Sequence, residues 1–113
     1  MGANYWVLLI FAPLLILVGI LGFFIPQKKS LTSGAPAYNV FHIAFGIIGI
    51  LIIAFGGDNA MRTFNFGFGL IDLYQYVASR WRLFPREHFR WKPADDLLHL
   101  VIGAILVVVA ILL

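Results

Sequence analysis

The sequence predicts an all-α, polytopic membrane protein whose four transmembrane helices form two helical hairpins of the same orientation. Of the 113 residues, 62% are hydrophobic and 12% are charged, whereas a soluble domain has about 45–50% apolar and about 25% charged residues. The apolar residues also form long blocks without charges. This pattern excludes a disordered chain, a soluble nucleic-acid-binding module and nearly all soluble enzyme folds. The lack of cysteine excludes disulfides, a thiolate nucleophile and cysteine-ligated metals.

We expect a single membrane domain over residues 1–113. Three of its four membrane spans are clear from the sequence, and the third along the chain requires further argument. The first span, at about residues 5–25, carries no charge and is long enough for a bilayer core of about 30 Å. It lacks the basic start and cleavage site of a signal peptide, so we expect a retained helix. The second and fourth spans are expected at about residues 40–55 and 97–113.

The third span, at about residues 63–79, is less apolar than the others. Its polar residues Asn65, Asp72, Gln75 and Ser79 are spaced by 7, 3 and 4 positions, so they share one stripe of a helix. We interpret this segment as a membrane-spanning helix with the polar stripe turned inward. The alternative is a helix that lies in the membrane interface, which would leave three spans.

The distribution of Lys and Arg predicts how the chain is threaded through the membrane. Lys28 and Lys29 lie between the first two spans, and five more basic residues lie in the loop at residues 80–94, against Arg62 alone on the other side. Both termini should therefore be extracytoplasmic and both basic loops cytoplasmic. We expect a bacterial inner membrane or a thylakoid-type membrane.

The second and fourth spans open with the same pattern, [Asn/Asp]-x-x-His-x-x-x-Gly. The matched residues, each offset by 57 positions, are Asn39, His42 and Gly46 in one span and Asp96, His99 and Gly103 in the other. A repeated pattern of this kind indicates two helical hairpins related by an axis along the membrane normal.

This motif has a structural and a functional interpretation. In the structural one, Asn39 and Asp96 are helix N-caps, and His42 and His99 are hydrogen-bonded groups near the cytoplasmic interface. In the functional one, His42 and His99 lie at equal depth on parallel helices and bind a haem or a chlorophyll. The structural interpretation implies that no cofactor is bound, and we prefer it to the functional one.

Asp72 is the only carboxylate expected at membrane depth, where such groups are paired, protonated or functional. Gln75 and Tyr76 follow it toward the cytoplasm, the side from which His42 and His99 enter. These five residues should form one polar cluster. We favour a hydrogen-bonded network that fixes the register of the helices. The alternative is a proton or ion pathway through Asp72.

The loop before the fourth span interleaves basic and aromatic residues. Beside two membrane spans, this mixture favours contact with anionic lipid headgroups, or with an acidic face of a membrane partner, over nucleic acid. The contact residues we expect are Arg80, Trp81, Arg82, Arg86, Arg90, Trp91 and Lys92.

Several of these motifs resemble a bacterial family of small four-helix integral membrane proteins classed as a domain of unknown function. The resemblance is carried by Asn39-x-x-His42-x-x-x-Gly46, Arg62-x-Phe64, Leu83-Phe84 and Asp96-x-x-His99. It implies four-helix architecture and no particular chemistry. Tyr38 stands where that family often has a further histidine.

The sequence favours a non-enzymatic protein, a small accessory or scaffold subunit of a larger membrane complex. Its helices are rich in Phe and Gly and expose an apolar perimeter suited to packing against lipid and other subunits. The alternatives are tetrapyrrole binding through His42 and His99 in an electron-transfer or photosynthetic complex, and an ion pathway through Asp72.

Overall fold

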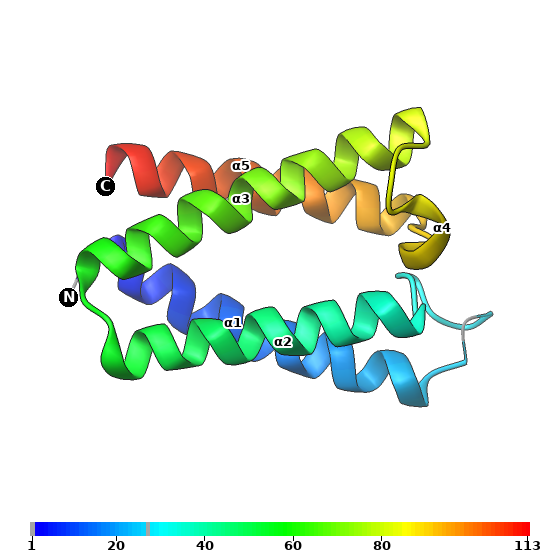
Figure 1. The fold of residues 1–113 in the computed structure, drawn as a ribbon, viewed down its shortest axis with the longest axis horizontal. Helices are drawn as coiled ribbons and strands as arrows, with labels where there is room; N and C mark the ends of the chain where they lie inside the picture. The colour runs from blue at the N-terminus through cyan, green and yellow to red at the C-terminus, as the bar shows by residue number, and fades with distance from the viewer. Residues whose placement is uncertain (1, 27) are drawn as a thin grey trace.

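Four long helices and one short helix make up the described part of the chain, which is residues 2–26 and 28–113 of a computed structural model (Figure 1). They are α1 (Ala3–Phe24), α2 (Pro36–Phe55), α3 (Asp58–Trp81), α4 (Arg86–Phe89) and α5 (Pro93–Leu112). Three of them, α1, α2 and α5, are long and apolar enough to cross a membrane. The prediction of an all-helical chain is confirmed, and these three helices are consistent with an integral membrane protein.

The second and fourth expected spans begin earlier than the sequence motif suggested, and this overturns the predicted helix caps. Pro36 and Pro93 occupy the first helical positions of α2 and α5, after Ala35 and Lys92 at the caps. Proline suits that position because its φ is fixed and it has no N–H to satisfy. Asn39 and Asp96 therefore lie inside the first turns, and the expectation that they cap the helices is wrong.

Helix α3 is the least apolar of the long helices. Three of the four residues of its predicted polar stripe are buried, and the fourth, Ser79 near the end of the helix, is partly buried. Asn65, Asp72 and Gln75 are at most 3% exposed. The outward face of the same helix carries large apolar side chains, including Phe66, Leu70 and Val77, which are 40–47% exposed. The charged residues other than Asp72 lie near the two ends of the helix, at positions 58, 62 and 80.

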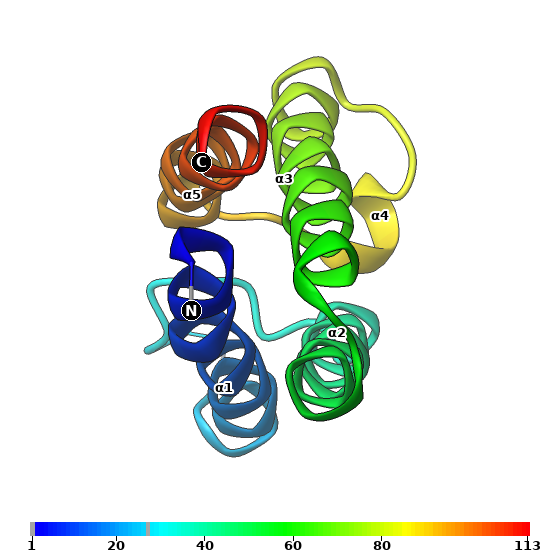
Figure 2. The same cartoon turned by 90° about the vertical axis from the view of Figure 1, so that its left-hand side faces the viewer.

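The long helices pack most closely in two pairs, α1 with α2 and α3 with α5. The helices of each pair run in opposite directions (Figure 1), and in the end-on view the four helices occupy four corners, with the α1–α2 pair below the α3–α5 pair (Figure 2). Glycine permits close approach within each pair. A Cβ on Gly46 would lie 2.9 Å from the carbonyl oxygen of Ala12, and one on Gly103 would lie 2.9 Å from that of Gly69.

Phenylalanine side chains fill the space between the two pairs. Phe68 of α3 is 2% exposed, and its ring centroid lies 5.5 Å from that of Phe11 on α1 and 5.1 Å from that of Phe45 on α2. Phe41 and Phe64 complete the group. Small residues thus join the helices within a pair, and large aromatic residues join one pair to the other.

Burial repeats along the chain with the 57-residue offset of the histidine motif. On α1 and α3, the buried residues that match at this offset are Asn4/Met61, Leu8/Asn65, Ala12/Gly69 and Leu15/Asp72. On α2 and α5, they are Tyr38/Asp95, His42/His99, Gly46/Gly103 and Gly49/Leu106. The offset therefore relates the buried faces of all four long helices, including two on which the motif itself is absent.

Candidate functional site

A cluster of buried polar side chains lies at the end of the bundle that holds α4 and the two longer connections, which we call the loop end (Figure 1). Helix α2 contributes Tyr38 and His42, α3 contributes Asp72 and Gln75, and α5 contributes Asp95 and His99. Each of these six side chains is at most 7% exposed. The cluster thus draws on three of the four long helices.

Tyr38 is at the centre of the cluster. Its hydroxyl oxygen lies 2.6 Å from Nε2 of His99 and 3.3 Å from Oδ1 of Asp95. Its ring packs against the imidazole of His42, with centroids 4.1 Å apart, and against that of His99, with centroids 5.9 Å apart. One phenol side chain therefore connects the polar residues of α2 with those of α5.

Asp95 connects the cluster to the loops. Its Oδ2 accepts hydrogen bonds from the backbone N–H groups of Ser33, at 2.7 Å, and Lys92, at 2.8 Å. The Ser33 hydroxyl in turn donates to the carbonyl oxygen of Phe89. Asp95 thus performs the capping role that the sequence assigned to Asp96, and it also fixes the connection between α1 and α2 against the start of α5.

A second chain of hydrogen bonds runs from Asp72 to the loop before α5. Nε2 of Gln75 donates to Oδ1 of Asp72 at 3.3 Å, and Nε1 of Trp91 donates to Oε1 of Gln75 at 3.1 Å. The Trp91 ring also meets the His99 ring edge-on, with centroids 6.5 Å apart. Trp91 therefore contacts the cluster through both Gln75 and His99.

The cluster lines one end of a cavity of about 260 Å³. Tyr38, His42, Asp72, Asp95 and His99 supply its polar wall. The remaining wall is mostly apolar and comes mainly from α1 and α5. Three of its residues, Leu14, Val18 and Leu98, are 37–48% exposed, so the cavity opens between α1 and α5 on the side of the bundle.

One ring nitrogen on each of the two histidines of this wall has no hydrogen-bond partner among the described residues. These atoms are Nδ1 of His42 and Nδ1 of His99, and both are buried. A buried polar atom without a partner costs about 1–3 kcal/mol. Native proteins seldom leave such atoms unpaired.

The structure brings together some of the residues that the sequence singled out and separates others. His42, Asp72 and His99 line the same cavity, and Gln75 contacts Asp72. Tyr76 lies instead beside Arg80, whose Cζ is 6.0 Å from the centre of its ring. The tyrosine of the cluster is therefore Tyr38, and the expectation for Tyr76 is corrected.

The predicted lipid or partner contacts also divide into two groups. Arg80, Trp81, Arg82, Arg86 and Arg90 are exposed. Trp91 and Lys92 are partly buried and bind within the chain, since Trp91 donates to Gln75 and Nζ of Lys92 donates to the carbonyl oxygen of Ser30 at 2.7 Å. Only the first group is free to meet a headgroup directly.

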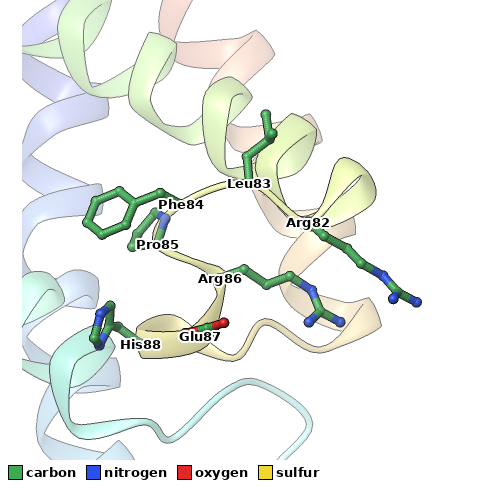
Figure 3. Close-up of a pocket in the computed structure, with 7 residues that line it drawn as sticks. All are labelled: Arg82, Leu83, Phe84, Pro85, Arg86, Glu87 and His88. Carbon is green, nitrogen blue, oxygen red and sulfur yellow. The ribbon is translucent and has the colours of Figure 1, made fainter.

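Two of the exposed arginines, Arg82 and Arg86, border a surface hollow of about 410 Å³ in the loop that follows α3. Arg82 and Arg86 extend from the loop in the same direction, away from the bundle, whereas the rings of Phe84 and His88 lie on the other side of the hollow (Figure 3). The positive charges therefore point outward at the loop end, where a bilayer would present phosphate groups.

The cluster does not have the form that a bis-histidine tetrapyrrole needs. Nε2 of His99 is held by the Tyr38 hydroxyl, and both imidazoles pack against the same phenol ring. The cavity volume also lies below the roughly 300–1,000 Å³ of sites that enclose a drug-sized ligand, and a macrocycle is larger still. The residues present therefore do not fit a haem or chlorophyll between His42 and His99.

Tyr38 and Asp95 were not singled out by the motif, although a signal for both exists. They are the residues just before Asn39 and Asp96, and they are 57 positions apart in the sequence. Extending the repeated motif by one residue toward the N-terminus in each half would have paired Tyr38 with Asp95. Asp95 is also the third residue of a helix that begins with proline, which is the position from which an acidic side chain reaches back to the cap.

Comparisons of the chain with protein-family models, with curated proteins and with solved structures give no match. The resemblance to the four-helix family therefore stays a prediction.

Proposed function

We propose that the protein is a non-enzymatic integral membrane protein in which all four long helices cross the bilayer as two repeated hairpins of the same orientation. The observation that carries this proposal is the division of α3 into two faces. The polar residues Asn65, Asp72 and Gln75 in the middle of the helix are buried inside the bundle. The exposed face there carries large side chains, namely Phe66, Leu70, Tyr74 and Val77. An interfacial helix would instead turn a polar face to water.

The repeat supports the same arrangement. The 57-residue offset relates buried positions on α1 to those on α3 and buried positions on α2 to those on α5. Two pairs of equivalent residues also touch, Phe11 with Phe68 and Tyr38 with Asp95. Equivalent residues meet in this way when they lie near a twofold axis, as expected for two hairpins related by an axis along the membrane normal.

The charges favour one direction of threading. The loop end carries seven basic residues, and both termini lie at the opposite end of the bundle (Figure 1). By the positive-inside rule, the loop end is cytoplasmic and both termini are extracytoplasmic.

Alkaline phosphatase fusions test the spans and the threading together. We expect activity for fusions at Leu113 and at Gly57, and none for a fusion within residues 85–92. If α3 lay in the interface, Gly57 and residues 85–92 would face the same compartment. Equal activity of those two fusions would therefore contradict the four-span proposal, and an inactive Leu113 fusion would contradict the direction of threading.

Within the membrane, we assign the protein the role of a small accessory or scaffold subunit. Large apolar side chains are exposed on all four long helices, and this perimeter suits helix packing against another membrane protein as well as lipid. Cross-linking in the native membrane followed by purification in mild detergent tests the role. We expect a defined set of co-purifying membrane proteins, and recovery of a single species from cross-linked membranes would contradict it.

A proton or ion pathway is not favoured by the geometry. A second polar contact exists away from the loop end, where Nδ2 of Asn65 donates to Asn4. Along α3, however, the buried ring of Phe68 lies between Asn65 and Asp72, and Phe11, Leu15 and Leu106 surround that level. The polar groups at the two ends are thus separated by an apolar layer.

A further inference from the structure

The cavity at the loop end combines a polar inner wall with an apolar mouth. Leu14 and Val18 of α1 and Leu98 of α5 are exposed at this mouth. If these helices cross the bilayer as proposed, the mouth faces acyl chains and not water. A molecule that enters from this side must therefore be soluble in lipid.

The size of the cavity limits what part of such a molecule it can hold. At about 260 Å³, it is slightly smaller than sites that enclose a whole drug-sized ligand. A compact ring or head can fit inside, while a long apolar tail has to leave through the mouth between α1 and α5. The shape thus selects a small head joined to an apolar tail.

The chemistry of the inner wall excludes an anionic head. Two carboxyl side chains, Asp72 and Asp95, contribute to the wall, and no Lys or Arg is among its described residues. A phosphate or carboxylate would meet acidic groups with no cation to balance it. Phospholipids and fatty acids are therefore poor occupants, and a neutral head is favoured.

The imidazole of His42 indicates how a neutral head would be held. Its ring lines the cavity, and Nε2 has no hydrogen-bond partner among the described residues and is not one of the fully buried ring nitrogens. Nε2 can donate or accept a hydrogen bond, depending on the tautomer. A carbonyl or hydroxyl oxygen on a ring would pair with it, and the rings of Tyr38 and Phe11 supply aromatic contact surface.

We infer that this cavity binds the ring head of a lipid-soluble quinone or quinol, with Nε2 of His42 as a hydrogen-bond partner and the tail of the molecule between α1 and α5. A quinone ring is neutral and flat, and it carries oxygen atoms that hydrogen-bond to imidazole. This inference concerns binding alone and rests on the membrane insertion proposed above.

Saturation binding of decylubiquinone to the purified full-length protein in lipid nanodiscs tests the inference, with empty nanodiscs as the blank for partition into lipid. We expect saturable binding at one site per chain. 1-Decanol carries the same ten-carbon tail without the ring and should compete at least tenfold more weakly. Equal competition by 1-decanol, or no saturable binding, would overturn the inference.

Two pairs of variants locate the site. His42→Leu removes an imidazole from the inner wall, and His88→Leu is its control in the exposed loop. Leu98→Trp narrows the mouth from an exposed position, and Leu97→Trp makes the same change at a neighbouring exposed residue outside the cavity. We expect His42→Leu and Leu98→Trp to weaken binding at least tenfold and the controls to bind normally.

If His42→Leu does not fold, the comparison of Leu98→Trp with Leu97→Trp still tests the location of the site, since both leucines are at the surface. Equal binding by Leu98→Trp and Leu97→Trp would overturn the location of the site. The failure of the inference can also be distinguished from that of the proposed function. A protein that inserts into nanodiscs with the expected fusion pattern but binds no quinone contradicts only the inference, whereas a protein that does not insert contradicts the proposed function.

Discussion

At the scale of single residues, the Tyr38 hydroxyl is the group on which the polar cluster depends. It lies within hydrogen-bond reach of His99 and Asp95, both of which are buried. Tyr38→Phe keeps the ring contacts but leaves these polar atoms with one partner fewer. We expect a loss of about 1–3 kcal/mol in the free energy of unfolding, measured by denaturation in detergent.

Tyr74→Phe is the matched control for this change. Its hydroxyl donates to the carbonyl oxygen of Phe84 in an exposed hydrogen bond, so this carbonyl can bond to water when the hydroxyl is removed. We expect a cost well below that of Tyr38→Phe. Similar losses for the two variants would show that the buried hydroxyl has no special role.

A second prediction at this scale compares two neighbouring aspartates. Asp95 accepts hydrogen bonds from Ser33 and Lys92, whereas Oδ1 of Asp96 has no partner among the described residues. Asp95→Ala should therefore destabilise the protein by about 1–3 kcal/mol, and Asp96→Ala should cost less. Thermal unfolding in detergent gives the comparison, and a larger effect at Asp96 would restore the capping role first expected for it.

The sequence predicted the histidines and Asp72 but not the residues that link them. His42, His99 and Asp72 stand out because polar side chains are rare in apolar segments. Tyr38 and Asp95 were overlooked because the expected helices began after them, at residues 40 and 97. Once proline is placed at the first helical position, both residues move into the first turn and onto the buried face.

At the scale of helices, close packing within each pair depends on glycine. A Cβ on Gly46 would lie 2.5 Å from Cγ1 of Ile16, and one on Gly103 would lie 3.0 Å from Cβ of Asp72. Gly46→Leu and Gly103→Leu should force the helices apart and prevent correct folding. We expect no folded, monodisperse protein for either variant when purified in detergent and examined by gel filtration.

Val108→Leu is the control for the glycine variants. Val108 is 51% exposed on α5, so a larger apolar side chain there extends away from the bundle and meets no neighbouring helix. Its melting temperature should stay close to that of the unchanged protein. Equal tolerance at positions 46, 103 and 108 would contradict glycine-mediated contact in both pairs.

The existence of the long helices followed from composition, but their ends and partners did not. Uncharged apolar blocks predicted three of them directly, and the spacing of polar residues predicted that one face of α3 is buried. Helix α4 was not predicted because its four residues are too few for a periodic pattern. The match between α1 and α3 was missed because it consists of buried positions occupied by different residue types, such as Leu15 and Asp72.

At the scale of the whole molecule, two glycine-packed helix pairs meet through a layer of phenylalanine. Phe68 lies at the centre of this layer, since its ring contacts those of Phe11, Phe41, Phe45 and Phe64. These rings come from α1, α2 and α3, so Phe68 joins the second pair to both helices of the first. The close glycine contacts within each pair do not include this residue, although Phe68 also packs in one buried cluster with Leu106 of α5.

Phe68→Ala should therefore loosen the association of the two pairs while each pair stays packed. In a well-packed core, Phe→Ala costs about 3–5 kcal/mol, and rigid pairs would be unable to close over the space that the ring leaves. Phe55→Ala, at a residue 86% exposed, should cost little by the same denaturation assay. Cross-linking of a cysteine pair placed across α1 and α2 should be unaffected by Phe68→Ala, whereas cross-linking across α2 and α3 should slow. If both cross-links changed equally, the two pairs would not be separate packing units, and the molecule would behave as one bundle held together by all four helices at once.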